Sequence, residues 1–350
     1  MLVSLVLTAG LAACGDGAAE SPTFAQATPP TGATPGTPAP TGVGGLGTGP
    51  SAKPTKMPAS TANCAGMPGD NVWRADVSRL PVHPKSAAFV ASIGAGATMH
   101  PDFGSGLWEG APIGIPVTTV SAGQAKVAVS FAYDGESDRG PYPIPRNAKI
   151  EGGADGSGDR HVIVHDKAAC KVYELFDAHP QGGGWRAGSG AVFDLKSNKL
   201  RRAGWTSADA SGLSIFAGLV RYEEVAAGRI DHAIRITVPR TRTGYTWPAT
   251  HSASDRTDAD LPQLGQRLRL KAGYGTAGMP KQARIVAEAM KKYGVIVADH
   301  GSAWYISGAP DDRWDNDALR ALKSISGEDL EVVDVSGLIV SKTSGQVRAA

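Results

Sequence analysis

The sequence predicts a mainly β protein, an antiparallel β-sandwich or jelly-roll-like domain with a few short helices near the C-terminus. Apolar and polar residues alternate over short segments, turn residues such as Gly, Pro, Asn and Asp separate those segments, and few helical patterns lie between them. Many short strands without intervening helices are typical of sandwiches and jelly rolls. The expected strands are residues 115–121, 125–133, 160–166, 171–177, 190–195, 213–222, 229–238, 266–272, 294–299, 303–307 and 330–335.

Two helices are expected in the C-terminal part of the chain. Residues 280–293 carry apolar side chains at helical spacing, with Pro280 in the first turn and Gly294 just past the end. Residues 315–325 form a shorter pattern of the same kind, with Asp315 as the expected N-cap. Each pattern has a single apolar stripe, which predicts that one face of each helix packs inward.

Composition divides the chain into four parts. Residues 1–13 are an apolar leader, expected to be a lipoprotein signal peptide. Residues 14–66 are mostly Ala, Gly, Pro, Thr and Ser, which cannot bury enough apolar surface to offset chain entropy, so we expect a disordered tether. A single β-rich globular domain is expected over residues 67–340, followed by a flexible tail over 341–350.

The N-terminal segment LVSLVLTAGLAAC is uncharged, apolar and too short to span a bilayer, as expected for the hydrophobic region of a signal peptide. Its end, LAAC, resembles the lipobox of bacterial lipoproteins. The resemblance implies cleavage before Cys14, lipidation of Cys14, and attachment of an extracytoplasmic protein to the membrane through that lipid alone. The alternative is an ordinary secretory signal cut nearby, which would give a secreted protein.

Charge and missing motifs argue against several classes of function. The chain has 35 Lys and Arg against 33 Asp and Glu, and no basic run suits a phosphate backbone, so we expect no nucleic-acid partner. The motifs of P-loop nucleotide hydrolysis, zincin proteolysis and common serine acyl transfer are absent. We expect no cofactor and no metal. Asp134, Glu136 and Asp138 alternate as in a calcium loop, but a solvated turn explains them as well.

Two cysteines remain besides Cys14. In an oxidising compartment, Cys64 and Cys170 are expected to form one disulfide that joins the start of the globular domain to the strand after Cys170. The alternative is a pair of free thiols.

Two strand segments place ionisable side chains in apolar rows. Alternation puts Glu174 between Val172 and Phe176, and it puts His232 in a row of isoleucines with Arg235 on the opposite face. If the two strands line one cleft, low polarity raises the pKa of the carboxyl group and suits general acid catalysis. Glu174 and His232 are therefore the acid/base candidates, and Arg235 is a candidate partner for a substrate charge. The alternative is that Glu174 and His232 bond only within the core.

Several tryptophans lie beside polar residues, a combination that suits sugar recognition. The CH face of a sugar stacks on an aromatic ring, and its hydroxyl groups need polar partners. Because glycoside hydrolysis normally needs two carboxyl groups, Glu109 and Asp177 are candidates for the second one. The candidate substrate-binding residues are Trp108, Glu109, Trp247, His251, Asp299, His300 and Trp304.

Four stretches resemble segments of secreted bacterial proteins: WRADVSRLPVHPKSAAFVASIG, GPYPIP, GSGAVFDL and GWTSADASGL. The resemblance implies no particular activity and no catalytic residue. We expect a lipid-anchored or secreted protein whose β-rich domain acts on an extracellular polysaccharide or cell-wall glycan, as a hydrolase or lyase. The alternatives are a non-catalytic glycan-binding module and a structural or adhesive protein of the cell envelope.

Overall fold

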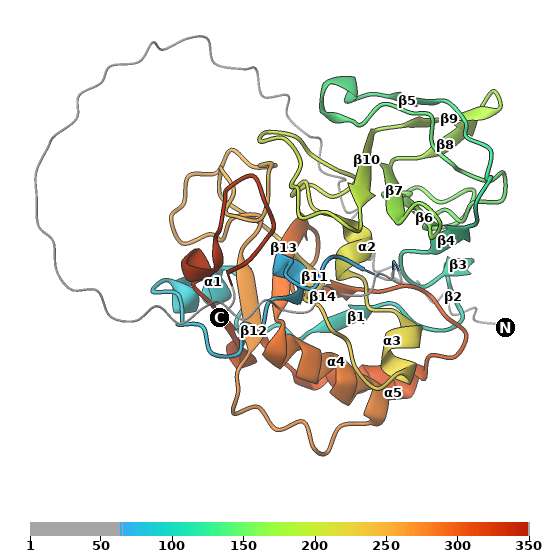
Figure 1. The fold of residues 1–350 in the computed structure, drawn as a ribbon. Helices are drawn as coiled ribbons and strands as arrows, with labels where there is room; N and C mark the ends of the chain where they lie inside the picture. The colour runs from blue at the N-terminus through green and yellow to red at the C-terminus, as the bar shows by residue number, and fades with distance from the viewer. Residues whose placement is uncertain (1–63, 65, 349–350) are drawn as a thin grey trace, which may run out of the picture. The chain divides into compact units, whose positions relative to one another are not determined.

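A computed structural model of the chain describes Cys64 and residues 66–348. The expected signal peptide, the expected lipidation at Cys14 and nearly all of the expected tether lie outside the described residues. Strands predominate over helices in the part that is described, as the sequence predicts, and they form four sheets, none of which is closed (Figure 1).

The largest sheet has six strands and a mixed arrangement. Its outer strand β1 pairs with β14 in parallel, β11 pairs with β13 in parallel, and the other neighbours are antiparallel. The strands, in spatial order, are β1 (His100–Asp102), β14 (Tyr305–Ser307), β11 (Ile234–Val238), β13 (Val295–His300), β12 (Arg267–Leu270) and β15 (Leu330–Val332).

The remaining strands form smaller sheets. The four-stranded sheet contains β10 (Ser189–Asp194), β7 (Lys171–Phe176), β6 (Val162–Asp166) and β4 (Val117–Val120), with β4 parallel to β6. The three-stranded sheet contains β5 (Val129–Phe131), β9 (Gly184–Ala187) and β8 (His179–Gln181), with β5 parallel to β9. A hairpin is formed by β2 (Leu107–Trp108) and β3 (Ala111–Pro112).

The expected strand-rich class is therefore observed, but the described residues show no clear antiparallel sandwich or jelly roll. Each of the three larger sheets contains a parallel pair. Strand direction depends on the connections rather than on side-chain alternation: parallel strands need a long crossover, and antiparallel strands do not. Between the parallel strands β11 and β13, for example, the chain first passes through β12, which is antiparallel to β13, and then through α4.

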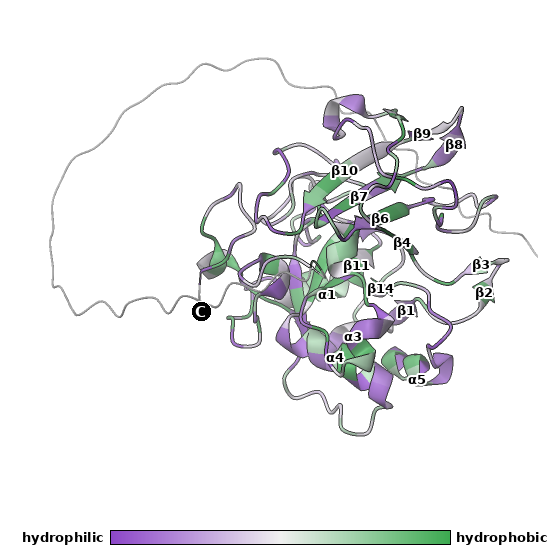
Figure 2. Cartoon of the chain, turned by 45° about the vertical axis from the view of Figure 1, so that its right-hand side comes forward, coloured by the Kyte–Doolittle hydropathy of each residue, from purple (hydrophilic) through white to green (hydrophobic). Residues whose placement is uncertain are grey.

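Helices cover parts of the six-stranded sheet. The longest is α4 (Lys281–Lys292), close to the expected helix; it starts after Pro280 and ends before Gly294, which has φ +69°. Its hydrophobic and hydrophilic residues fall on different sides in Figure 2. The other helices are α1 (Ser86–Ile93), α2 (Ile215–Gly218), α3 (Tyr222–Ala226), α5 (Asn316–Arg320), and the short 3-10 turns η1 (Val72–Arg74), η2 (Asp134–Glu136), η3 (Ala321–Ser324), η4 (Gly327–Asp329) and η5 (Ser336–Leu338).

Within residues 213–222, where we expected a strand, the chain forms the helix α2 and the first residue of α3. Ser214 caps α2, because its hydroxyl oxygen accepts a hydrogen bond from the Ala217 amide. Glu174 of β7 accepts hydrogen bonds from the Ser214 hydroxyl and from the first two amides of α2. The helix therefore depends on a partner that is 40 residues from Ser214 in sequence. Local alternation of apolar residues could not reveal that partner.

The two faces of the six-stranded sheet differ in chemistry. On one face, Ile234, Val295 and Leu268 belong to the same hydrophobic core as Val286 and Met290 of α4. The strand register places Arg235 and Arg267 on the opposite face. That face is covered by α2 and by the segment that contains η1. Charged side chains are therefore buried on the second face.

Long-range bonds hold both ends of the described chain. Cys64 and Cys170 form the expected disulfide, which ties the start of the domain to β7. Part of the stretch that we expected to be a flexible tail is bonded to the domain. The Gly345 carbonyl accepts the Val72 amide at 2.7 Å, and the Ser344 carbonyl accepts the indole N–H of Trp247 at 2.9 Å.

Candidate functional site

Arg235 lies at the centre of a buried ionic network. It is 4 % exposed and donates from Nε and Nη2 to the two carboxylate oxygens of Asp209, at 2.8 and 2.9 Å. Its Nη1 donates to the Ser307 hydroxyl at 2.7 Å, and Nη2 lies 3.4 Å from Asp299. This two-pronged geometry is the one that a guanidinium makes with an ionised carboxylate. Burial alone would lower the pKa of Arg235, but Asp209 and Asp299 raise it above its usual range.

The loop that carries Asp209 is held against the ends of the sheet strands. Asp299, at the end of β13, accepts the Ala210 amide at 3.2 Å. Burial raises the pKa of Asp209; Arg235 opposes this rise and Asp299 adds to it. A third carboxyl group is contributed by Asp102, the last residue of β1, which lies opposite Ser307 in the strand register.

His161 and Glu151 form a second ionic pair next to this network. The His161 Nδ1 lies 2.5 Å from a Glu151 oxygen, and its Nε2 lies 3.1 Å from the Ala208 carbonyl oxygen, one residue before Asp209. Both partners are acceptors, which suits an imidazolium. Burial alone would lower the pKa of His161, but Glu151 and Asp159 raise it to about 9. Burial would likewise raise the pKa of Glu151, but His161 lowers it.

Asp102 and a further carboxyl group, Asp159, face the same charges from more exposed positions. Asp102 and Asp159 are exposed side chains. Partial desolvation raises the pKa of Asp102, Glu151 adds to that rise, and Arg235 opposes it. Partial desolvation also raises the pKa of Asp159, where His161 and Arg235 oppose the rise while Asp299 and Glu151 add to it. We call this group the Arg235 cluster; it comprises Asp102, Glu151, Asp159, His161, Asp209, Arg235 and Asp299.

A glycine-rich loop, EGGADGSGDRH, carries one side of the Arg235 cluster. Arg160 holds it in place, since this 5 % exposed side chain donates to backbone carbonyls of Gly153, Ala154 and Gly156. Its Nε also donates to the Ala178 carbonyl at 3.2 Å. The loop is thereby fixed by a side chain, which gives Glu151 and Asp159 defined positions despite the many glycines.

The Arg235 cluster can provide both an acid and a base. Glu151, with a lowered pKa, is ionised near neutrality and is able to accept a proton or attack an electrophile. Asp102 and Asp159, with raised pKa values, are better able to donate a proton than an ordinary aspartate. Pairs of carboxyl groups whose pKa values are shifted in opposite directions are characteristic of acid–base sites.

Glu174 occupies a different position. It is fully buried, and it accepts hydrogen bonds from the Ser214 hydroxyl and from the amides of Ile215 and Phe216, at 2.7 to 3.0 Å. Burial raises its pKa, and these bonds oppose the rise. It bonds to the Ser214 cap and to the first two amides of α2, and these contacts stabilise the junction between β7 and the helix.

His232 and Glu174 were predicted to lie on adjacent strands, but they lie in different parts of the fold. His232 precedes β11, and Glu174 belongs to the four-stranded sheet. The His232 Nδ1 donates to the Ala233 carbonyl at 2.7 Å, and Nε2 lies 3.2 Å from Glu224. Glu224 also binds Arg221. Of the three predicted catalytic residues, only Arg235 belongs to the Arg235 cluster.

The tryptophans predicted to bind substrate differ in exposure. Trp304 is fully buried and its indole N–H donates to the Gly94 carbonyl, while Trp247 is 8 % exposed and bonded to Ser344. Neither ring is free to stack on a sugar in this conformation. Trp108 is 70 % exposed, and Glu109 beside it is exposed too.

The predicted polar residues separate in a similar way. Asp299 belongs to the Arg235 cluster. His251 contacts the loop that carries Asp209, because its Nδ1 donates to the Ala210 carbonyl at 2.8 Å. His300 is 2.7 Å from the Thr241 hydroxyl, and burial lowers its pKa. Asp177 lies elsewhere, in contact with His179 at 2.7 Å.

Within residues 64 and 66–348, no group of three or more His, Cys, Asp or Glu side chains is arranged to hold a metal ion. The stretch with alternating carboxyl groups is used for protein contacts instead. Asp138 pairs with Arg201, Asp134 pairs with Arg139 at 2.8 Å, and Glu136 accepts the Thr206 amide at 3.2 Å.

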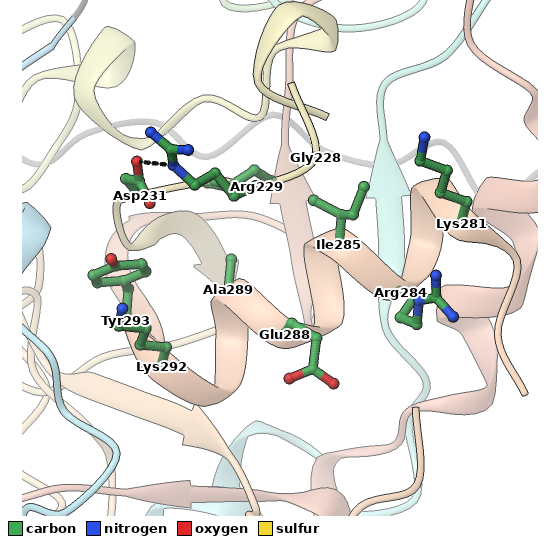
Figure 3. A pocket seen from close by; sticks show the side chains of 11 residues that line it. Gly228, Arg229, Asp231, Lys281, Arg284, Ile285, Glu288, Ala289, Lys292 and Tyr293 are labelled. Carbon is green, nitrogen blue, oxygen red and sulfur yellow. Dashed lines mark hydrogen bonds and ion pairs between the residues drawn. The ribbon is translucent and has the colours of Figure 1, made fainter. Parts of the chain in front are cut away.

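A separate surface pocket of about 350 Å³ lies between α4 and the chain that follows α3 (Figure 3). Arg229 and Asp231 form an ion pair at its edge, at 2.7 Å. None of its residues belongs to the Arg235 cluster. They are Gly228, Arg229, Ile230, Asp231, Lys281, Arg284, Ile285, Glu288, Ala289, Lys292 and Tyr293.

Sequence reasoning did not single out four carboxyl groups of the Arg235 cluster, namely Asp102, Glu151, Asp159 and Asp209, and His161 was not among its candidates. These residues come from separate segments that only the strand pairing brings together. One local signal was available: Glu151, Asp159 and His161 surround a glycine-rich loop directly before a strand, and loops of this kind often carry functional side chains.

The chain matches no known family model, no curated protein and no solved structure. No helix in the described part of the chain is long and apolar enough to cross a membrane.

Proposed function

We propose that this protein is an extracytoplasmic glycoside hydrolase, lipid-anchored or secreted, that cleaves a polysaccharide at the Arg235 cluster. One observation carries the proposal. Within one ionic network, the pKa of Glu151 is lowered while the pKa values of the exposed Asp102 and Asp159 are raised. Glycoside hydrolysis needs one carboxylic acid and one carboxylate at the same bond.

The roles follow from the charges. Asp102 or Asp159 donates a proton to the leaving glycosidic oxygen. Glu151, which His161 holds ionised, activates water or attacks the anomeric carbon. The Arg235–Asp209 pair supports the loop and the strand ends that carry these groups. His161 is thus a positioning residue rather than a catalytic one.

Hydrolysis is favoured over lyase chemistry because the cations of the Arg235 cluster are already paired and buried. A polysaccharide lyase must neutralise the carboxylate of a uronate before a base removes the neighbouring proton. The cations of the Arg235 cluster, Arg235 and His161, are already paired with Asp209 and Glu151 and are almost fully buried. Neither is available to a uronate in this arrangement.

The proposed location outside the cytoplasm rests on the lipobox resemblance at Cys14. The disulfide between Cys64 and Cys170 supports it, since disulfides persist in oxidising compartments. The second candidate function is a non-catalytic glycan-binding module, which the exposed indole of Trp108 favours. A structural or adhesive envelope protein needs neither the shifted pKa values nor the exposed ring.

The test is a panel of neutral, amino-sugar and uronate polysaccharides incubated with the purified full chain. Reducing-end release reports hydrolysis, ultraviolet absorbance of an unsaturated product reports lyase activity, and retardation in a polymer-containing gel reports binding alone. The proposal predicts reducing ends without the absorbance. Absorbance would support a lyase, retardation without product would support a binding module, and no response would contradict any glycan-directed role.

A further inference from the structure

The β2–β3 hairpin presents an unusually exposed tryptophan. Trp108 is 70 % exposed and Leu107 is 66 % exposed, the two largest values among the large hydrophobic side chains of the described residues. The turn between the strands consists of Glu109 and Gly110, with φ of +51° and +83°. Positive φ at both central positions is what a type I′ hairpin turn requires. Large aromatic rings usually bury most of their surface, so an indole that remains in water needs an explanation.

The base of the hairpin is fixed to the rest of the domain. The Gly104 amide donates to the Ile113 carbonyl at 3.2 Å, across the base of the hairpin. Ser105 and Asn316 of α5 exchange two hydrogen bonds, each of 3.0 Å. On the other side, the Ile115 amide donates to the Gly308 carbonyl just after β14. The indole is therefore presented on a supported element and not on a free loop.

The strand register gives the direction of the indole. Trp108 lies opposite Ala111, and directly opposed residues of an antiparallel pair point to the same face. Ala111 is 6 % exposed, and a methyl group added at Gly153 would be in van der Waals contact with it. Gly153 belongs to the glycine-rich loop that carries Glu151, so Trp108 is on the face of the hairpin that is turned toward that loop. Leu107 is on the opposite face.

We propose that Trp108 stacks against a pyranose ring of the polysaccharide next to the Arg235 cluster, and that this ring is uncharged or carries an amine rather than a carboxylate. This inference rests on the proposed function of that cluster. The stacking surface follows from the exposed indole and its direction. The preference against acidic sugars follows from charge, because the carboxyl groups of the cluster outnumber its cations, and both cations are already paired.

The experiment compares Trp108→Ala with Leu107→Ala, a matched control on the opposite face of the same hairpin. Each is also placed in a Glu151→Gln background, so that binding is measured without turnover. Affinity for each polymer of the panel is read by gel retardation and by the change in tryptophan fluorescence. We expect Trp108→Ala to weaken binding of a neutral or amino-sugar polymer by about tenfold or more, and Leu107→Ala to leave it nearly unchanged. Trp108→Phe should retain part of the affinity.

The inference is overturned if the two alanine variants bind equally well, if both lose affinity together, if uronate polymers bind best, or if no polymer binds. The proposed function fails separately. Binding that depends on Trp108 without product release would contradict catalysis but leave the stacking role intact. Product release that is unchanged in Trp108→Ala would contradict the stacking role but leave the proposed catalysis intact.

Discussion

Arg235 and Asp209 are joined by two parallel hydrogen bonds of 2.8 and 2.9 Å, both from the guanidinium to the carboxylate, and both residues are almost fully buried. The pair connects β11 to the loop that also contacts His161 and Asp299. Breaking it would leave a charge buried without a partner, which costs far more than a surface ion pair contributes.

We therefore expect Arg235→Met to lower the free energy of unfolding by about 3 to 5 kcal/mol, because Asp209 would remain buried without its cation. Arg267 provides the comparison. It is 1 % exposed on the same face of the sheet, donates only to the carbonyls of Val72 and Ala75, and its Nε has no hydrogen-bond partner. Burial lowers the pKa of Arg267 to about 9.

Arg267→Met should accordingly cost less than about 1 kcal/mol, since it removes a buried cation that has no carboxylate. Urea denaturation of both variants, followed by circular dichroism, checks the contrast. Equal losses in the two variants would mean that the carboxylate of Asp209 is not the source of the difference.

Glu174→Gln tests whether the buried glutamate is structural. The amide keeps one acceptor oxygen for three donors, from Ser214, Ile215 and Phe216, and its NH₂ group faces other donors. We expect a loss of about 1 to 3 kcal/mol in unfolding free energy. The turnover of the folded fraction should be unchanged. A loss of turnover in fully folded protein would restore the catalytic interpretation of Glu174.

The pair formed by His161 and Glu151 should make stability depend on pH. The pKa of His161 is raised from 6.5 to about 9, so its contribution is fully present below pH 6.5 and is lost as the pH rises through 9. The pKa of Glu151 is lowered from 4.5, so its contribution is present above pH 4.5 and is lost as the pH falls through its folded value. The full effect is therefore expected between pH 4.5 and 6.5.

Denaturation should be measured from pH 6.5 to a pH well above 9. Over this interval the wild-type free energy of unfolding should fall by about 3 kcal/mol. His161→Gln should be less stable near pH 6 and should lack this alkaline decline. A parallel pH dependence in the variant would show that other groups are responsible.

The disulfide should contribute strongly, because Cys64 and Cys170 are 106 residues apart. Replacing both by Ser removes a cross-link that restricts the unfolded chain. The chain-entropy model predicts a loss of about 4 to 5 kcal/mol. Melting of the double variant beside the wild type, with and without reductant, checks this. A wild type that melts at the same temperature in both conditions would contradict it.

The sequence predicted burial better than it predicted partners. Alternation correctly indicated that Glu174 and His232 are buried, and cysteine content indicated the disulfide. Alternation did not show that Glu174 meets Ser214, because that contact creates a helix where local residues favour a strand. Partners are set by strand order, which depends on long-range packing that a single sequence does not display.

The same limit explains why the sequence did not predict the candidate site. Asp102, Glu151, Asp209, Arg235 and Asp299 lie in five distant segments, each ordinary by itself. They meet because β1, β11 and β13 share a sheet and the loops before β6 and after β10 close over their ends. Arg235 and Asp299 were identified from the sequence, but their common surroundings were not.

The most direct test of the account is turnover of the most readily cleaved polymer by single variants of the cluster. Glu151→Gln should reduce kcat by about a hundredfold or more. Of Asp102→Asn and Asp159→Asn, the variant that removes the general acid should reduce kcat by a similar factor. Glu328→Gln, an exposed carboxyl group of η4 outside the cluster, is the matched control and should keep wild-type turnover. Wild-type kcat in all three cluster variants, with the fold intact, would contradict the assignment of this site.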